Sequence, residues 1–228
     1  MSKVIARPVL LLVLTVITSF ALLLQSAPAG AAVWYWYKPG HPMNIAGAGC
    51  TGSWALRGSD GMFFLTAGHC ASGVNAVVSG TDTRFGFVRR NEDPSMDALL
   101  VQPDSGVDAY QIVEVNGITV GRTTGMVHNW SLTPGTVVSK GGRTTGITSG
   151  TIRVQSTWDG RERVYCGDYA ACAGDSGGPV YQKAGSSVLA VGVHVGRQRQ
   201  PSGVLYSCFI SIDDLLARFG AWLPVFSG

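Results

Sequence analysis

The sequence is poor in charge, and the charges it has do not gather by sign. Charged residues make up 14% of the 228, and the formal net charge is +3. Two of the 17 basic residues, Lys3 and Arg7, lie within the first 32 positions, where no acid occurs, so the remainder carries +1. Proteins that bind nucleic acid concentrate positive charge in a patch or run. No such run is present, and we expect no nucleic-acid partner.

The cysteines lack the spacing of a metal site. None forms a Cys-x-x-Cys pair, and no histidine lies near Cys166 or Cys172. Structural zinc is held by clustered cysteine and histidine ligands, so we predict no bound metal. The number of cysteines is five, and an odd number leaves at least one free or paired between chains.

A long hydrophobic run occurs once, at the N-terminus. Two basic residues precede the apolar stretch 9–24, and small residues follow it. This pattern predicts a secretory signal peptide over 1–32, cleaved after Ala29, Ala31 or Ala32, with the last two favoured. We expect a secreted protein that keeps disulfides and has no membrane partner once the signal is removed. The alternative is an uncleaved anchor, because the run approaches the ~20 residues that span a bilayer.

Short runs of β-branched and aromatic residues, broken by glycine, fill the rest of the chain. About 196 residues remain after the signal, enough for one domain or two small barrels. Short strands with glycine turns are typical of a sandwich or a barrel. We predict strands over 62–66, 74–78, 85–88, 98–101, 136–138, 151–154 and 188–195.

Helical periodicity is clear only near the C-terminus. Ile212, Leu215 and Phe219 recur at three- and four-residue steps after an acidic start, which predicts one closing helix. The stretch 104–125 is the least strand-like and is the candidate connection between two halves. We place the boundary near residue 120.

Three segments carry the residue types that catalyse acyl transfer. They are 65–70 (LTAGHC), 95–100 (SMDALL) and 172–179 (CAGDSGGP). Acyl transfer by serine needs a base that takes the hydroxyl proton, a buried carboxylate that orients the base, and N–H groups that face the developing oxyanion. The order histidine, aspartate, serine supplies all three.

The segment 174–178 also matches the G-x-S-x-G elbow of α/β-hydrolases. In that fold the acid and the histidine follow the serine on a strand–helix alternation. Downstream of the serine only His194, Asp213 and Asp214 are available, and the upstream chain lacks helical periodicity. The elbow interpretation is therefore disfavoured.

Taken together, the three segments resemble the catalytic blocks of the chymotrypsin-fold serine peptidases. The likeness runs from about 48 to 220 and is most specific at 66–70 and 174–179. The segments 142–146 and 149–152 resemble the compact actinobacterial branch of streptogrisins and alpha-lytic protease.

The resemblance implies an all-β fold of two packed antiparallel Greek-key β-barrels with a short C-terminal helix. The first barrel would span 33–120 and carry the histidine and the aspartate of the triad. The second would span 121–228 and carry the serine and the helix.

The resemblance also implies a role for each catalytic residue. His69 would be the general base and acid, Asp97 would orient it, and Ser176 would be the nucleophile. The N–H groups of Gly174 and Ser176 would form the oxyanion hole. Asp93 competes with Asp97 for the orienting role, but Asp97 leads directly into an apolar run that buries it, whereas Asp93 precedes a proline in a turn-like stretch.

The same resemblance implies two disulfides. Cys50 and Cys70 would tie down the histidine loop, and Cys172 would pair with Cys208 across the specificity pocket. Cys166 would then be the odd cysteine, with a Cys166–Cys208 bridge as the alternative.

Asp175 precedes the serine and is expected to be buried. A buried carboxylate needs a cationic partner. The actinobacterial branch uses an internal arginine, and the matching residue here is Lys140, so we expect a Lys140–Asp175 pair and no need for a new N-terminus.

The resemblance also bears on the primary specificity. Ala170 stands where trypsin-like members carry aspartate, and with Ala171 it implies an uncharged wall and cleavage after small or medium apolar residues. The alternative is a glutamyl endopeptidase, because 192–196 resembles the strand whose histidine, here His194, faces the substrate carboxylate. The pocket residues implied are Ala170, Ala171, His194, Val195, Gly196 and Arg197.

We therefore expect a secreted, monomeric serine endopeptidase that needs no metal or organic cofactor. Its partners would be peptide or protein substrates, with a proteinaceous inhibitor as a further candidate. The alternative from another functional class is an inactive peptidase-fold protein used only for binding.

Overall fold

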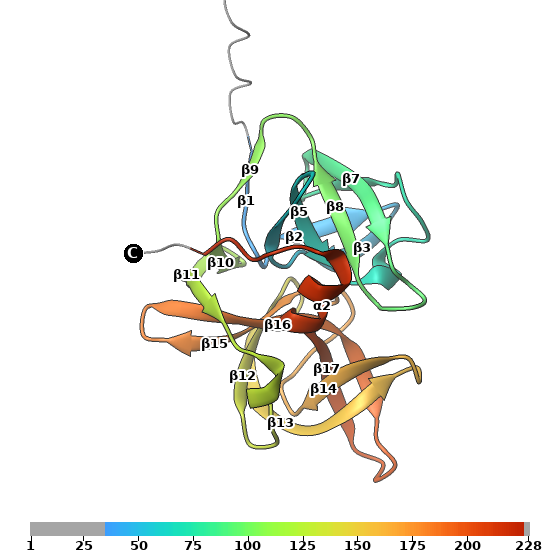
Figure 1. Cartoon of the computed structure of the whole chain (residues 1–228), viewed down its shortest axis with the longest axis vertical. Helices are drawn as coiled ribbons and strands as arrows, with labels where there is room; N and C mark the ends of the chain where they lie inside the picture. The colour runs from blue at the N-terminus through green and yellow to red at the C-terminus, as the bar shows by residue number, and fades with distance from the viewer. Residues whose placement is uncertain (1–34, 226–228) are drawn as a thin grey trace, which may run out of the picture. The chain divides into compact units, whose positions relative to one another are not determined.

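Short strands separated by glycine turns make up most of the chain, as the sequence predicts. The computed structural model describes residues 35–225, and the predicted signal peptide lies outside these residues. The described residues belong to one compact unit. Its strands form two barrels, one at the blue to green end of the chain and one at the yellow to red end (Figure 1).

The first barrel is a seven-stranded antiparallel sheet in the order β3-β2-β6-β7-β8-β5-β4. Its interior is aromatic, and the rings of Tyr37 and Phe64 stack with centroids 3.9 Å apart. A separate two-stranded parallel pair joins β1 to β9. The strands are β1 (Tyr35–Tyr37), β2 (Pro42–Ile45), β3 (Ala48–Thr51), β4 (Ala55–Gly58), β5 (Gly61–Thr66), β6 (Val77–Ser79), β7 (Arg84–Asn91), β8 (Leu99–Pro103) and β9 (Val107–Ala109).

The second barrel belongs to an eight-stranded sheet in the order β10-β11-β16-β15-β12-β13-β14-β17. The six strands from β16 to β17 in this order form the barrel, which an additional pairing of β16 with β17 closes. The pairs are antiparallel except β11 with β16, which is parallel. The strands are β10 (Ile112–Val115), β11 (Ile118–Met126), β12 (Val137–Gly142), β13 (Gly146–Trp158), β14 (Glu162–Gly167), β15 (Pro179–Ala184), β16 (Ser187–Arg199) and β17 (Leu205–Ser211).

The stretch 104–125, predicted as a connection, contains strands instead. β10 and β11 form a hairpin there and pair with the second sheet. Val113, Val115 and Val120 are buried. The change from the first sheet to the second therefore occurs between β8 and β10, earlier than the predicted boundary near residue 120.

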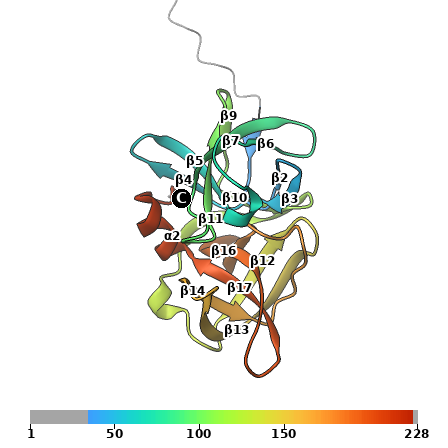
Figure 2. The same cartoon turned by 90° about the vertical axis from the view of Figure 1, so that its right-hand side faces the viewer.

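The predicted C-terminal helix is confirmed as α2 (Ile212–Phe219). The Ser211 side chain caps it by accepting a hydrogen bond from the Asp214 N–H, and Gly220 ends it in the left-handed conformation with φ +61°. In both views α2 lies at the level where the two barrels meet (Figures 1 and 2). Among the described residues, no helix is long and apolar enough to span a membrane.

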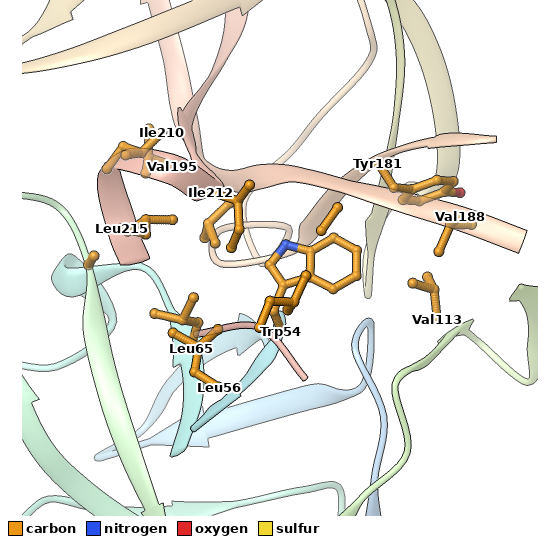
Figure 3. Close-up of a cluster of buried hydrophobic side chains, with 14 of the residues drawn as sticks. Trp54, Leu56, Leu65, Val113, Tyr181, Val188, Val195, Ile210, Ile212 and Leu215 are labelled. Carbon is orange, nitrogen blue, oxygen red and sulfur yellow. The ribbon is translucent and has the colours of Figure 1, made fainter. Parts of the chain in front are cut away.

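A single hydrophobic cluster joins the barrels. Trp54 stands at its centre, between Leu65 of the first barrel and Ile212 at the start of α2 (Figure 3). The Trp54 indole is fully buried and donates a hydrogen bond to the Gly192 carbonyl, 2.9 Å away. Burial of this much apolar surface fixes the barrels against each other, so that residues from both can share a site.

Candidate active site

His69 lies in a 3₁₀ turn, Gly68–Cys70, directly after β5. Two features hold this turn. The Cys50–Cys70 disulfide ties it to β3, and the Asn91 side chain donates hydrogen bonds to the carbonyls of Gly68 and Ala71, at 3.1 and 2.9 Å. The imidazole is therefore anchored on one side while 44% of it remains exposed.

Asp97 contacts His69 through both carboxylate oxygens. Nδ1 of His69 lies 3.0 Å from Oδ1 and 2.9 Å from Oδ2, and the His69 backbone N–H donates to Oδ1 at 2.9 Å. The Asp97 side chain is 4% exposed. Because the hydrogen bond and the charge of Asp97 favour the imidazolium, the pKa of His69 is raised above 6.5. A carboxylate at Nδ1 favours the tautomer that carries its proton there, and in that tautomer Nε2 can accept a proton.

Asp93, the competing acid, occupies a different environment. Its side chain is 38% exposed and lies 4.0 Å from the Arg161 guanidinium. No hydrogen bond joins it to His69 in the described part of the chain. The structure therefore places Asp97, and not Asp93, against the histidine.

Ser176 lies in the loop between β14 and β15 and lines the same cleft as His69 and Asp97. The cleft has a volume of about 710 Å³. The Thr51 N–H holds the loop to the first barrel by donating to the Ser176 carbonyl at 2.8 Å, and the Gly177 N–H holds it to β16 by donating to the His194 carbonyl at 2.7 Å.

Two N–H groups beside Ser176 are available to a ligand. Within residues 35–225 the N–H groups of Gly174 and Ser176 donate to no protein acceptor. Gly174 has φ +93°, and a Cβ there would lie 2.5 Å from Thr144 Oγ1. Only glycine adopts this conformation without strain. Backbone donors without a protein acceptor beside a serine are groups of the kind that stabilise an oxyanion.

Asp175 is buried and pairs with Lys140 of β12. Both side chains are fully buried, with Lys140 Nζ 3.0 Å from Asp175 Oδ2. Further hydrogen bonds reach the carboxylate from the Thr145 hydroxyl at 2.6 Å and the Cys172 N–H at 2.9 Å. Burial opposes ionisation, but these hydrogen bonds and the Lys140 charge together lower the pKa of Asp175 from 3.8 to about 2. The aspartate thus anchors the loop that carries Ser176.

The comparisons with known proteins agree with this geometry. A protein-family profile described as Trypsin matches residues 42–218, which is most of the chain. The chain belongs to the trypsin family. The predicted chymotrypsin-fold serine peptidase is confirmed, and the protein is a serine endopeptidase.

Solved structures of bacterial trypsin-family proteases are similar to this one over most of its length. Cellulomonas bogoriensis chymotrypsin is 25% identical, with 84% of this chain and 100% of that chain covered and a TM-score of 0.66. Thermobifida fusca protease A is 26% identical, with 84% and 100% covered and a TM-score of 0.67. A glutamic acid specific serine protease that uses a histidine triad in substrate binding is 22% identical, with 82% and 100% covered and a TM-score of 0.68, and shows the fold alone. No curated protein sequence matches the chain.

The second disulfide of this trypsin-family protease corrects the expected pairing. Cys166 bonds to Cys208, and Cys172 is free and exposed. Cys166 of β14 lies directly opposite Cys208 of β17 in the antiparallel register, whereas Cys172 lies in the loop beyond the end of β14. The expected Cys172–Cys208 bridge is therefore wrong, and the alternative that the sequence left open is present.

The expected pocket residues separate into two groups. Ala171, His194, Val195, Gly196 and Arg197 line the cleft with Ser176. Ala170 is not among the lining residues, and its carbonyl accepts a hydrogen bond from Thr148 Oγ1 at 2.7 Å. The Ala170 carbonyl therefore faces the neighbouring strand β13.

His194 lines the cleft but is almost fully buried. It is 1% exposed, and its Nδ1 lies 3.1 Å from the Tyr169 hydroxyl. Burial and the nearby charge of Lys140 lower the pKa of His194 to about 3, so the ring is neutral at physiological pH.

Sequence reasoning missed two residues of the site. Tyr169 contacts His194, and Glu162 contacts the backbone of Asp97. Neither lies in a motif, and tertiary packing brings each to the site, Glu162 across the two barrels and Tyr169 within the second. The described residues offer one triplet with the closeness of a metal site, Cys50, His69 and Cys70, but both sulfurs are committed to the disulfide.

Proposed function

We propose that this serine endopeptidase cleaves peptide bonds through an acyl-enzyme on Ser176, with His69 as general base and acid and Asp97 as the orienting carboxylate. The observation that carries the proposal is the contact of His69 Nδ1 with the buried Asp97 carboxylate, 2.9 Å away, at a cleft that Ser176 also lines. This arrangement leaves Nε2 of His69 to accept the serine proton.

The reaction proceeds in two halves. Ser176 Oγ attacks the substrate carbonyl carbon as its proton moves to His69 Nε2, and the imidazolium is stabilised by Asp97. The oxyanion accepts hydrogen bonds from the N–H groups of Gly174 and Ser176. The C–N bond then breaks, and the leaving amine takes the proton from His69. A water molecule, deprotonated by His69, next attacks the acyl carbon, and Ser176 Oγ leaves with the proton.

The buried Lys140–Asp175 pair supports activity without a new N-terminus. Lys140 comes from within the folded domain and already neutralises Asp175. We propose that the domain is active as folded. Its two disulfides, Cys50–Cys70 and Cys166–Cys208, are compatible with secretion after removal of residues 1–32.

For the primary specificity we propose small or medium apolar side chains. The cleft beside Ser176 is bordered by Ala171 and Val195, which are small, uncharged and without hydrogen-bonding side chains. The alternative preference for glutamate rests on His194, and Arg197, which is exposed, lines the same cleft. Buried and neutral, His194 can offer a substrate carboxylate an N–H but no charge.

A phosphonofluoridate probe tests the proposed nucleophile. The probe reacts stoichiometrically only with an activated serine, so wild-type protein is expected to be labelled at Ser176, located by peptide mapping. Ser176→Ala should remain unlabelled and Asp97→Asn should react far more slowly. Folded wild-type protein that stays unlabelled would favour the binding-protein alternative.

Peptide-library cleavage tests the specificity. We expect cleavage after alanine, valine or leucine, unchanged in Arg197→Met. Cleavage after glutamate that Arg197→Met and His194→Val both abolish would replace the apolar preference with the glutamyl one.

A further inference from the structure

The segment that carries Asp97 belongs to the first barrel and is hydrogen-bonded to residues of the β13–β14 hairpin and of α2. It connects β7 to β8, and residues 92–96 form its turn. From the β13–β14 hairpin, Arg161 donates a hydrogen bond to the Pro94 carbonyl. From α2, the Arg218 guanidinium donates to the Ser95 hydroxyl, 2.6 Å away. The position of the aspartate therefore depends on groups that lie far away in the sequence.

Glu162 contacts the backbone of Asp97 directly. It is the first residue of β14, and its Oε1 accepts a hydrogen bond from the backbone N–H of Asp97 at 3.0 Å. Glu162 is only 8% exposed. It has no salt-bridge partner among the described residues, and burial raises its pKa. A buried acid without a cation is costly, and the hydrolytic mechanism above makes no use of it.

We propose that Glu162 is a positioning residue, which holds the orienting aspartate against the histidine by accepting the hydrogen bond of the Asp97 backbone. This inference rests on the proposed function of the triad.

The bonding around Asp97 explains why its backbone matters. Among the described residues, the groups that donate to its carboxylate all belong to His69, the residue it must orient. No third group fixes the carboxylate. Its placement therefore follows from the backbone at residue 97, whose N–H would have no acceptor without Glu162. A buried N–H without a partner favours any local shift that restores one.

The role requires an oxygen acceptor and no charge. A carbonyl oxygen on a side chain of the same length serves as well as a carboxylate, so Glu162→Gln preserves the contact. Glu162→Met keeps the unbranched shape and removes the acceptor. This pair of variants separates the hydrogen bond from side-chain volume and from electrostatics.

The test is steady-state hydrolysis of a peptide anilide. We expect Glu162→Gln to keep kcat within threefold of wild type. Glu162→Met should lower kcat by about 10- to 100-fold, as a misplacement of about 1 Å does, with KM within threefold, because the residue does not line the cleft. A wild-type kcat in Glu162→Met would overturn the proposal. Equal losses of kcat in Glu162→Gln and Glu162→Met would also overturn it.

A double-mutant cycle distinguishes action through Asp97 from a general effect on folding. In an Asp97→Ala background, Glu162→Met should change kcat by less than threefold, because the group it positions is absent. A further 10- to 100-fold loss there would overturn the proposal. Lys183→Met, at an exposed lysine of β15 whose Nζ bonds to the Val120 carbonyl, is the control and should keep kcat within threefold.

Two further measurements cover the cases in which Glu162→Met does not fold or the triad itself is inactive. If Glu162→Met does not fold, Glu162→Asp withdraws the acceptor by one methylene and should also lower kcat, and wild-type activity in that variant would overturn the proposal. Failure of the triad itself would show separately, as absence of phosphonofluoridate labelling in wild-type protein.

Discussion

Replacing Lys140 by methionine removes the positive charge beside Asp175 while keeping most of the side-chain volume. Both partners are fully buried, with Nζ 3.0 Å from Oδ2. The substitution leaves Asp175 a buried anion without a cation, although the Thr145 hydroxyl and the Cys172 N–H still donate to it. Cys172 and Asp175 lie in the loop that carries Ser176, and Thr145 contacts Asp175. Loss of the Lys140 charge should therefore also disturb the N–H groups of Gly174 and Ser176.

The magnitude follows from two considerations. Removing one partner of a buried ion pair costs about 3–5 kcal/mol. The pKa of Asp175 falls from 3.8 to about 2 in the folded protein, which corresponds to about 2–3 kcal/mol from its partners after the opposing cost of burial is subtracted. Since the hydrogen bonds survive the substitution, we expect the lower end of the first range, a loss of about 3 kcal/mol at pH 7.

The pH dependence has a definite sign. A carboxylate whose folded pKa is depressed contributes stability above its unfolded value, here 3.8, and loses it as the pH falls toward 2. The difference in unfolding free energy between wild type and Lys140→Met should therefore be largest at neutral pH and narrow between pH 4 and pH 2.

Urea unfolding measures this difference, with Ser176→Ala in every chain to prevent self-digestion. Lys183→Met is the matched control, because Lys183 is exposed and its Nζ donates one hydrogen bond to the Val120 carbonyl at 2.8 Å. The control should lose less than about 1 kcal/mol. In chains that keep Ser176, anilide hydrolysis should fall with Lys140→Met. A stability loss below about 1 kcal/mol at pH 7, with full activity, would refute the reasoning.

Three further outcomes are expected at the site. Gly174→Ala should lower kcat about 10²- to 10³-fold in anilide hydrolysis, because alanine is strained at φ +93° and its Cβ would collide with Thr144; near-normal kcat would contradict the assigned oxyanion hole. The pH profile of kcat/KM should fall in acid through an apparent pKa above 6.5, because Asp97 favours protonated His69 and only the neutral ring is a base; a midpoint below 6.5 would contradict this. One thiol per chain, Cys172, should react with a thiol reagent under native conditions, and a bulky adduct should block the cleft that it lines, whereas Cys172→Ser should be active and unreactive.

The sequence alone determined the features that depend on neighbouring residues. The C-terminal helix follows from apolar residues at three- and four-residue steps with a serine before them and a glycine after them, and it forms over Ile212–Phe219. The motifs around His69 and Ser176 contain both the reactive side chains and the glycines that their turns require. The same short segments therefore predict the chemistry and the local backbone geometry. Asp97 could be preferred over Asp93 because an apolar run follows it, and the structure places it against His69.

The tertiary structure decided the features that depend on strand register and on the packing of the two barrels against each other. Cys208 bonds to Cys166 because the two face each other on β14 and β17, and linear spacing does not reveal which cysteine a strand will oppose. The hairpin of β10 and β11 was not predicted because it is stabilised by the pairing of β11 with β16 and by burial. Glu162 belongs to no motif and lies 65 residues from Asp97. It meets the catalytic segment only because the hydrophobic cluster around Trp54 packs one barrel against the other.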